Sequence, residues 1–570
     1  MKKGILGIIT FFLFLNFLLG VNFKGRIVCK SGKPLNVGYV LIKKEGANKF
    51  IKSNLSKNGS FEFKNIEEGL YTFKVDIFSV EKLKNKIEIK GKEIRKDFIV
   101  SLSLLDRILI KVRGLSDFMW GTWMIILLLG TGIILTFVTG FVQIRRLISA
   151  LKLVLKGAFK KDLTKKEEGD ISPYAALMTA LAATVGNGNI AGVATAIATG
   201  GPGAPFWMWM AGFFGMATKY AEGFLGVKYR KKNKFGEMAG GPMYYARYGI
   251  KWKPAAKFLG LLFAISGGIT AIFGTGNMAQ SNSMALAFKT QFNIPFWASG
   301  LVIAILTGIV TIGGIKKIGS VSEKLVPSMI LFYFAGALVI IIANFTKIPA
   351  AFVLIFKSAF SVKAVGGALI GTSVKQAISI GVRRGVLSNE AGLGSAAIAQ
   401  AASKSPEPVY NGLIAMTGTF IDTIVVNTLT TLTIILSGAY LFTAAYGSSE
   451  GLTSTALTMK AFSSVIPHGG IIIALSSFLF GYSTLLGWSY YGEKSVEYVF
   501  GEKVIYPYRI IFIVALFIGA IVQGAHLNII WYLGDSANAM MAFPNLVALL
   551  FLIGIVKKET VKKLYEKKLW

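Results

Sequence analysis

Long apolar stretches dominate the chain after residue 118, and short polar loops separate them. A helix of about 20 apolar residues can cross ~30 Å of hydrocarbon. The pattern predicts an all-α polytopic membrane protein with about eleven transmembrane helices. We expect these helices at residues 119–142, 172–200, 204–228, 255–287, 293–314, 322–344, 364–385, 408–438, 468–490, 506–526 and 537–556.

The first 105 residues follow a different pattern. Residues 1–20 join a lysine pair to a short apolar run, which is typical of a signal peptide or of an uncleaved anchor. Residues 21–105 alternate apolar and polar positions between turn pairs such as Asn58-Gly59, which predicts a small all-β domain. A signal in front of this domain would place it outside the membrane. There it either contacts the cell envelope or merely extends and stabilises the protein.

Basic residues gather in every second loop, for example at Arg145-Arg146, Lys231-Lys232 and Lys557-Lys558. Such loops are cytoplasmic in multi-pass proteins. The β domain is therefore expected outside a cell (inner) membrane, and the tail at 561–570 inside. The formal net charge of +34 follows from these loops, so the expected partner is the lipid bilayer and not nucleic acid.

The chain offers little for enzyme chemistry. Its single cysteine, Cys29, excludes an internal disulfide, and it has only two histidines. It contains no phosphate-binding loop, HExxH or nucleophile-elbow motif. We expect a protein that is not an enzyme and needs no organic cofactor.

The apolar stretch at 172–200 is interrupted by the run VGNGNIAG, Val185–Gly192. Glycine is a poor helix former, and asparagine bonds to nearby backbone outside helices. Irregular backbone in a membrane occurs where it lines a cavity or is buried in protein, and secondary transporters build their ion and substrate sites there. The stretch at 364–385 also begins with glycines. The ten helices after the first therefore predict two inverted sets of five, which begin near 172 and 364.

Several long motifs lie in order between residues 115 and 560. They read ATVGNGNIAGVATAIATGGPGAPFWMWMAGFFGMATKYAE, FGTGNMAQSNSMA, GVRRGVLSNEAGLGSA, DTIVVNTLTTL and FGYSTLLGWSYYGEKSVEY. This region resembles the alanine or glycine:cation symporter family. The resemblance implies the leucine-transporter fold and inward symport of alanine or glycine with Na⁺ by alternating access. The N-terminal series with Gly25, Pro34-Leu35, Gly59 and Tyr71 resembles carboxypeptidase regulatory-like domains.

The predicted break supplies the first candidate site. Freed amides of Asn187, Gly188 and Asn189 would face a substrate carboxylate. Freed carbonyls of Ala182, Thr184 and Val185, with the Asn189 side-chain oxygen, would face cations. The alternative is that the glycines only let helices pack closely.

The resemblance implies further site residues. Ser483 and Thr484, with the Phe480 carbonyl, would bind Na⁺, or their hydroxyls would only bond back within their own helix. Gln280 would contact substrate or form an interhelical hydrogen bond. Trp488 would cap the pocket or belong to an interfacial aromatic belt. A second break at Gly366, Gly367, Gly371, Thr372 and Ser373 would hold the substrate ammonium, with Gly367 and Thr372 in contact with it.

Glu390 and Asp422 are acids at or near membrane depth. They line a gate or ion path, or they form structural ion pairs with Arg383 or Arg384, which is the interpretation we favour because a buried carboxylate needs a partner. Proton coupling or another substrate is the alternative within transport, but residues 185–192 contain no acid. A membrane sensor is the alternative of another class, although only a short basic tail follows Pro544.

Overall fold

The computed structural model divides into two compact units. The first contains Met1–Gly114 with Gln523–Ile529, and the second contains Leu115–Val522 with Ile530–Trp570. The structure describes residues 21–47, 50–77, 80–91, 93–159, 167–360, 374–405, 407–443 and 451–566. The expected signal segment, Gly367 and Thr372 lie outside the described residues.

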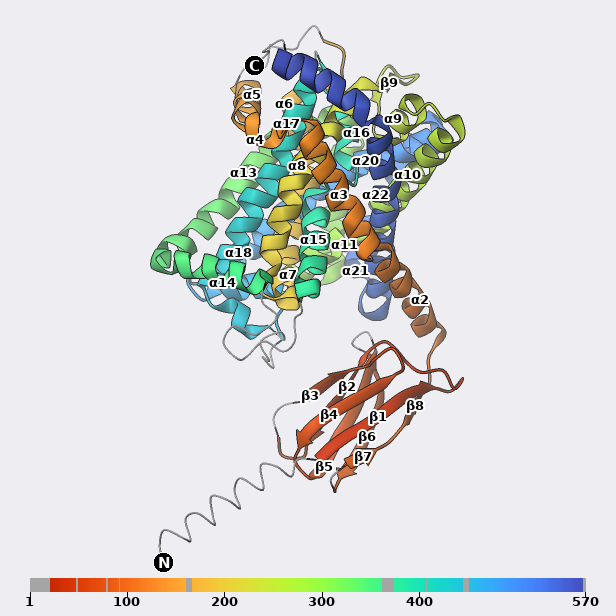
Figure 1. The fold of residues 1–570 in the computed structure, drawn as a ribbon, viewed down its shortest axis with the longest axis vertical. Coiled ribbons are helices and arrows are strands. Elements are labelled where there is room, and N and C mark those ends of the chain that lie inside the picture. Colours follow the sequence, from red (N-terminus) through yellow and green to blue (C-terminus); the bar gives the residue numbers. More distant parts are fainter. Residues whose placement is uncertain are drawn as a thin grey trace, which may run out of the picture. The chain divides into compact units, whose positions relative to one another are not determined.

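The first unit contains a β-sandwich (Figure 1). Its strands are β1 (Val21–Cys29), β2 (Tyr39–Lys44), β3 (Ile51–Asn54), β4 (Ser60–Ile66), β5 (Gly69–Ile77), β6 (Val80–Ile89), β7 (Glu93–Arg95) and β8 (Phe98–Val100). One sheet has the order β4-β1-β7, with β8 also paired to β1, and the other has the order β3-β2-β5-β6. Alternate residues of each strand point inward, because successive side chains of a strand face opposite sides. Phe23, Phe61 and Phe73 form the centre of this core.

The second unit is helical. Its elements are α2 (Leu104–Met119, which begins in the first unit), α3 (Thr122–Val138), α4 (Val142–Arg145), α5 (Leu147–Phe159), α6 (Pro173–Thr184), the π-helix η1 (Gly188–Gly192), α7 (Val193–Gly200), α8 (Ala204–Lys228), α9 (Pro242–Gly249), α10 (Lys253–Phe273), α11 (Met278–Phe292), α12 (Phe296–Thr311), α13 (Gly314–Ala343), α14 (Ile348–Phe360), α15 (Val374–Asn389), α16 (Ser395–Ala401), α17 (Pro408–Thr419), the π-helix η3 (Phe420–Val426), α18 (Asn427–Leu436), α19 (Ser454–Ser463), α20 (Gly469–Phe500), α21 (Ile505–Ile521), α22 (Gly524–Thr560) and η7 (Val561–Glu566). Two short strands, β9 (Lys231–Lys232) and β10 (Met238–Ala239), form a hairpin, and short 3₁₀ turns lie at Phe345–Lys347, Ala439–Phe442 and Glu502–Val504.

Seven described helices are long and apolar enough to cross a membrane, or eight if the bent pair Pro173–Thr184 and Gly188–Gly200 counts as one span. A described helix also overlaps each stretch in which the sequence predicts a span. Several of these helices are short or carry many polar residues, so length and composition do not establish the number of spans. The protein is therefore a multi-pass membrane protein, and the count of about eleven stays a prediction.

Two interruptions of the helices matter for the site. The first separates α6 from α7, which are bent by 47°. The second separates α15 from α16 at residues 390–394, where Glu390, Gly392 and Gly394 have positive φ angles of 57°, 91° and 81°. The second break was expected at Gly366–Ser373, outside the described residues, whereas this interruption follows α15 in the motif SNEAGLGS.

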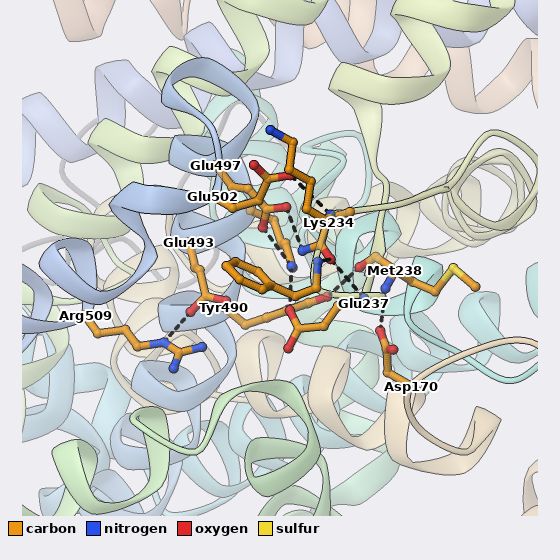
Figure 2. A network of polar contacts seen from close by, with 12 residues as sticks. Asp170, Lys234, Glu237, Met238, Tyr490, Glu493, Glu497, Glu502 and Arg509 are labelled. Carbon is orange, nitrogen blue, oxygen red and sulfur yellow. Dashed lines mark hydrogen bonds and ion pairs between the residues drawn. The ribbon is translucent and has the colours of Figure 1, made fainter.

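A separate polar network surrounds the β9–β10 hairpin (Figure 2). Lys494 is buried in α20 and ion-pairs with Glu497 at 2.7 Å and with Glu237 of the hairpin at 3.2 Å. The Met238 amide donates to the Asp170 carboxylate at 2.8 Å. Burial raises the pKa of Asp170, although the bond from Met238 opposes this shift. The hairpin is thus tied to α20 and to the segment before α6.

Candidate functional site

The first interruption is a turn closed by its own asparagine. α6 ends at Thr184, and Val185 leaves the helix with φ −75° and ψ 89°. The Gly186 amide donates to Asn189 Oδ1 at 2.9 Å, and the Asn189 amide donates to the Gly186 carbonyl at 3.0 Å. The predicted break is present, and local asparagine–backbone bonding is its cause.

Asn187 connects this turn to two other helices. Its amide nitrogen donates to Gln280 Oε1 on α11 at 2.9 Å, and its oxygen accepts from the Ser477 hydroxyl on α20 at 2.6 Å. Both Asn187 and Gln280 are buried. Asn187, whose backbone amide is expected to face the substrate, therefore contacts Gln280 through its side chain, and the interhelical bond offered as the alternative for Gln280 is present.

Four oxygen atoms gather where α20 meets the end of α6. The Ser483 hydroxyl lies 3.4 Å from the Val185 carbonyl oxygen and 2.9 Å from that of Phe480. The Thr484 hydroxyl also donates to the Phe480 carbonyl at 2.9 Å. Carbonyl and hydroxyl oxygens are ligands for hard cations. The structure thus brings Val185, Phe480, Ser483 and Thr484 together, although both hydroxyls bond back within α20.

Two of the three remaining expected cation ligands, Ala182 and Thr184, belong to the same turn of α6. The Thr184 hydroxyl donates to the Ala180 carbonyl at 3.1 Å and to that of Leu181 at 3.4 Å, so it faces its own helix. Ala182 is fully buried one turn before the break. Only their backbone carbonyls are therefore candidates for a cation.

Asn189 belongs to a second, separate polar cluster. Its Nδ2 lies 2.7 Å from Asp422 Oδ1, 2.9 Å from Asn427 Oδ1, 3.1 Å from Ser388 Oγ and 3.3 Å from the Asp422 carbonyl oxygen. An amide nitrogen has two hydrogens, so it cannot donate to all four oxygens at once. These side chains are fully buried. The result is an oxygen-rich centre with one carboxyl group beside the broken helix.

Sequence reasoning did not assign Ser388 or Asn427 to a site. Asp422 and Asn427 are five residues apart, and the wide turn of η3 places both side chains on the side that faces Asn189. π-helical turns of this kind often occur at functional sites. Both residues stand in the motif DTIVVN, so the asparagine after the acid was the available signal.

The ion pairs with Arg383 or Arg384 that we favoured for Glu390 and Asp422 are not present among the described residues. Arg383 ion-pairs with Asp535 instead. Glu390 instead accepts hydrogen bonds from Trp488 Nε1 at 2.8 Å and from the Ser395 hydroxyl. A charged partner was expected because burial of a carboxylate is costly, but neutral donors also satisfy a buried acid.

The argument against proton coupling also changes. Residues 185–192 contain no acid, yet the Asp422 carboxylate contacts Asn189 of that segment. An acid therefore stands beside the break in space, although none stands beside it in the sequence.

Trp488 is buried to 1% exposure and does not belong to an interfacial belt. Its indole lies against Gly276, where an added Cβ would approach the ring to 2.7 Å, and its N–H is bonded to Glu390. The residue thus joins α20 to the segment between α10 and α11 and to the second interruption.

A multi-pass chain whose broken helices carry buried oxygen clusters belongs to the class of membrane transporters and not to the enzymes. The profile of the Sodium:alanine symporter family matches residues 106–569, so the chain belongs to that family. The match begins after the β-sandwich.

Individual relatives agree with the family. The chain is similar to the Sodium/alanine symporter AgcS of Methanococcus maripaludis, with 50% identity over 79% of this chain and 96% of that protein. It is 45% identical to an uncharacterized transporter of Haemophilus influenzae over 78% of this chain and 94% of that protein. It is 35% identical to the probable sodium/glutamine symporter GlnT of Bacillus subtilis over 79% of this chain and 90% of that protein.

A solved structure, that of MhsT in complex with L-phenylalanine, matches 69% of this chain and 98% of that chain. Its TM-score is 0.45 and its sequence identity is 13%, a similarity too low to establish a shared fold.

Proposed function

We propose that this protein carries alanine or glycine into the cell together with Na⁺, by alternating access. Membership of the Sodium:alanine symporter family and 50% identity to a named sodium/alanine symporter support this function. The observation that carries it is the position of Asn187 and Asn189, which lie in one broken turn between two buried oxygen clusters.

The substrate would bind at the first break. The backbone amides of Asn187, Gly188 and Asn189 suit a carboxylate, and Gln280 lies in contact with Asn187. Trp488 lies beside Glu390 in the interruption at residues 390–394. From this position it would limit the pocket to substrates with small side chains. Gly367 and Thr372 remain proposed ligands of the ammonium group.

Two positions would hold Na⁺. One lies between the carbonyls of Ala182, Thr184 and Val185 on α6 and the oxygens of Phe480, Ser483 and Thr484 on α20. The other lies among the oxygens of Ser388, Asp422 and Asn427, beside the Asn189 amide group, where the carboxylate supplies a compensating charge. An ion that orders the broken turn would raise the affinity for substrate, and substrate would raise the affinity for the ion by the same factor.

The leucine-transporter fold with two inverted sets of five helices would provide the alternating access. The basic loops favour an N-terminal β domain (residues 21–105) outside the cell membrane and a tail (561–570) inside. The transmembrane domain would cover 115–560, after a signal or anchor at 1–20. The β domain would contact the envelope or stabilise the protein.

The test is uptake of radiolabelled alanine into proteoliposomes with an inward Na⁺ gradient, compared with K⁺ or choline. Accumulation should require Na⁺ and should be lost in Ser483→Ala/Thr484→Ala. Ser489→Ala is the matched control, because that hydroxyl donates to Leu486 within α20 and touches neither cluster. Na⁺-dependent uptake that survives the double change would refute the first cation site, and no uptake under any gradient would refute the function.

Proton coupling is the second candidate, and the contact between Asp422 and Asn189 favours it. Uptake in choline that follows an inward proton gradient would establish it. Uptake that does not change with the proton gradient would exclude proton coupling.

A further inference from the structure

Two side chains of α8 point at the second interruption, residues 390–394. Lys219 donates from Nζ to the carbonyl oxygen of Asn389, the last residue of α15, at 2.9 Å. Glu222 accepts with Oε1 from the amides of Gly392 at 2.9 Å and Gly394 at 3.1 Å. Lys219 is 2% exposed and Glu222 is fully buried. One helical turn of α8 therefore places a cation and an anion on the backbone at both ends of the interruption.

The signs of the two charges match the backbone groups that they meet. A helix leaves its last carbonyls unpaired, and its C-terminal end carries a partial negative charge. Lys219 meets this end of α15. The Gly392 and Gly394 amides would lack a partner in the interruption, and a carboxylate is the strongest acceptor for them. Residues three apart on a helix face the same side, so α8 presents both charges together.

A third side chain fastens the same segment from α22. Asn545 donates to Glu222 Oε1 at 2.7 Å and to the Gly392 carbonyl at 2.9 Å, and its oxygen accepts from the Tyr245 hydroxyl. Gly394 has φ 81°, and an added Cβ would lie 2.8 Å from the Asn545 side chain. The segment fits tightly between α8, which contacts both α15 and α16, and the Asn545 side chain of α22.

The first interruption has no such arrangement among the described residues. Its Val185 carbonyl accepts from the Ser483 hydroxyl, and its Gly186 amide donates to Asn189. These partners are neutral. The described part of the protein therefore places no charged side chain directly on this backbone, and the charged groups of a bound ligand would take that place. The two interruptions thus differ in whether the protein supplies the charges itself.

We propose that Lys219 and Glu222 form a charged clamp that holds the second interruption in a fixed shape on α8, so that ions and substrate act through the first. Both are positioning residues, and neither touches the proposed ligands. The inference rests on the proposed function for its consequence in transport, but the clamp itself can be tested without transport.

The structural test uses the full chain with Cys29→Ser, which removes its single cysteine, and Ala391→Cys as a reporter within the interruption. Ala391 is 4% exposed, so a small permeant maleimide should label the parent slowly. Lys219→Met and Glu222→Gln should each raise the labelling rate about tenfold, because the first removes the contact with the Asn389 carbonyl and the second removes the charge that faces the Gly392 and Gly394 amides. Lys228→Met is the control, since Lys228 lies on the same helix but pairs with Glu559. Its rate should stay within about twofold of the parent.

Parent-like labelling of both Lys219→Met and Glu222→Gln would overturn the clamp. If Glu222→Gln does not purify as a single species, Glu222→Asp replaces it. This change keeps the charge but withdraws it by one methylene, so faster labelling is expected and an unchanged rate would overturn the clamp.

The transport arm measures alanine uptake in the parent, Lys219→Met and Glu222→Gln. A several-fold lower maximal rate with an alanine KM within about threefold of the parent is expected, because the ligand contacts remain. A raised KM with an unchanged maximal rate would place these residues in the substrate site and overturn their positioning role. Absence of uptake in the parent would contradict the proposed function, while the labelling rates would still decide the clamp.

Discussion

Asn189 and Asp422 meet at 2.7 Å between Nδ2 and Oδ1, although 233 residues separate them in the chain. The same asparagine accepts from the Gly186 amide with its oxygen. One side chain therefore links a buried carboxylate to the turn that breaks the helix between α6 and α7. A cation bound at Asp422 would stabilise the conformation of the turn through this amide. The ordered turn would in return raise the affinity for the cation.

Asp422→Asn should weaken the dependence of uptake on Na⁺, because it removes the charge that would compensate a buried cation. The half-saturating Na⁺ concentration should rise about tenfold or more, which corresponds to ~1.4 kcal/mol of lost binding. Proteoliposome uptake at a series of Na⁺ concentrations measures it. Glu559→Gln, which breaks the Lys228 pair at the other end of α8, should leave the value unchanged. The same half-saturation in Asp422→Asn and in the parent would argue against a cation at this acid.

Gly186→Ala should destabilise the first break, because an added Cβ would overlap the Thr484 hydroxyl. Overpacking of this kind costs about 1–3 kcal/mol. The thermal midpoint of the purified transporter should fall, and Thr484→Ala in the same chain should recover part of the loss. Gly192→Ala is the control, since nothing lies within 4 Å of its added Cβ. Equal midpoints for the two alanine variants would contradict the close packing of Gly186 on α20.

Trp488→Phe should lower both stability and transport, because Glu390 loses its indole donor and keeps the Ser395 hydroxyl. Loss of a hydrogen bond to a buried charged group costs about 1.5–3 kcal/mol. Thermal unfolding and alanine uptake measure the two effects. Trp297→Phe serves for comparison, since that ring is 60% exposed. A Trp488→Phe transporter as stable as Trp297→Phe would show that the bond to Glu390 contributes little.

Phe73→Ala should unfold the β-sandwich and leave transport intact. Phe73 is fully buried and contacts Phe23, Phe61 and Phe98, and truncation of such a residue costs about 3–5 kcal/mol. Limited proteolysis should cleave within residues 21–103, while Na⁺-driven alanine uptake stays near that of the parent. The family match begins at residue 106, which supports this separation. Loss of uptake in proportion to cleavage would mean that the β unit takes part in transport.

The sequence by itself determined the features that depend on neighbouring residues. Apolar stretches long enough for a membrane, alternation in the β strands, and the glycines and asparagines of VGNGNIAG all act within a few residues. The helices, the sandwich and the break after Thr184 were therefore predictable. The family motifs added Ser483, which the structure places against Val185, and Thr484, which it places against Gly186.

Only the tertiary structure decided which distant groups meet. Glycine-rich runs at 365–371 and at 392–394 carry similar local signals, so the second interruption at Glu390–Gly394 was not chosen from sequence. Arg383 is close in sequence to Glu390, yet packing directs it to Asp535 on α22. Asp422 reaches Asn189 because η3 turns its side chain toward η1. Such contacts depend on how distant helices pack and on which neutral donors this packing brings to a buried acid. The local spacing of residues in the sequence determines neither.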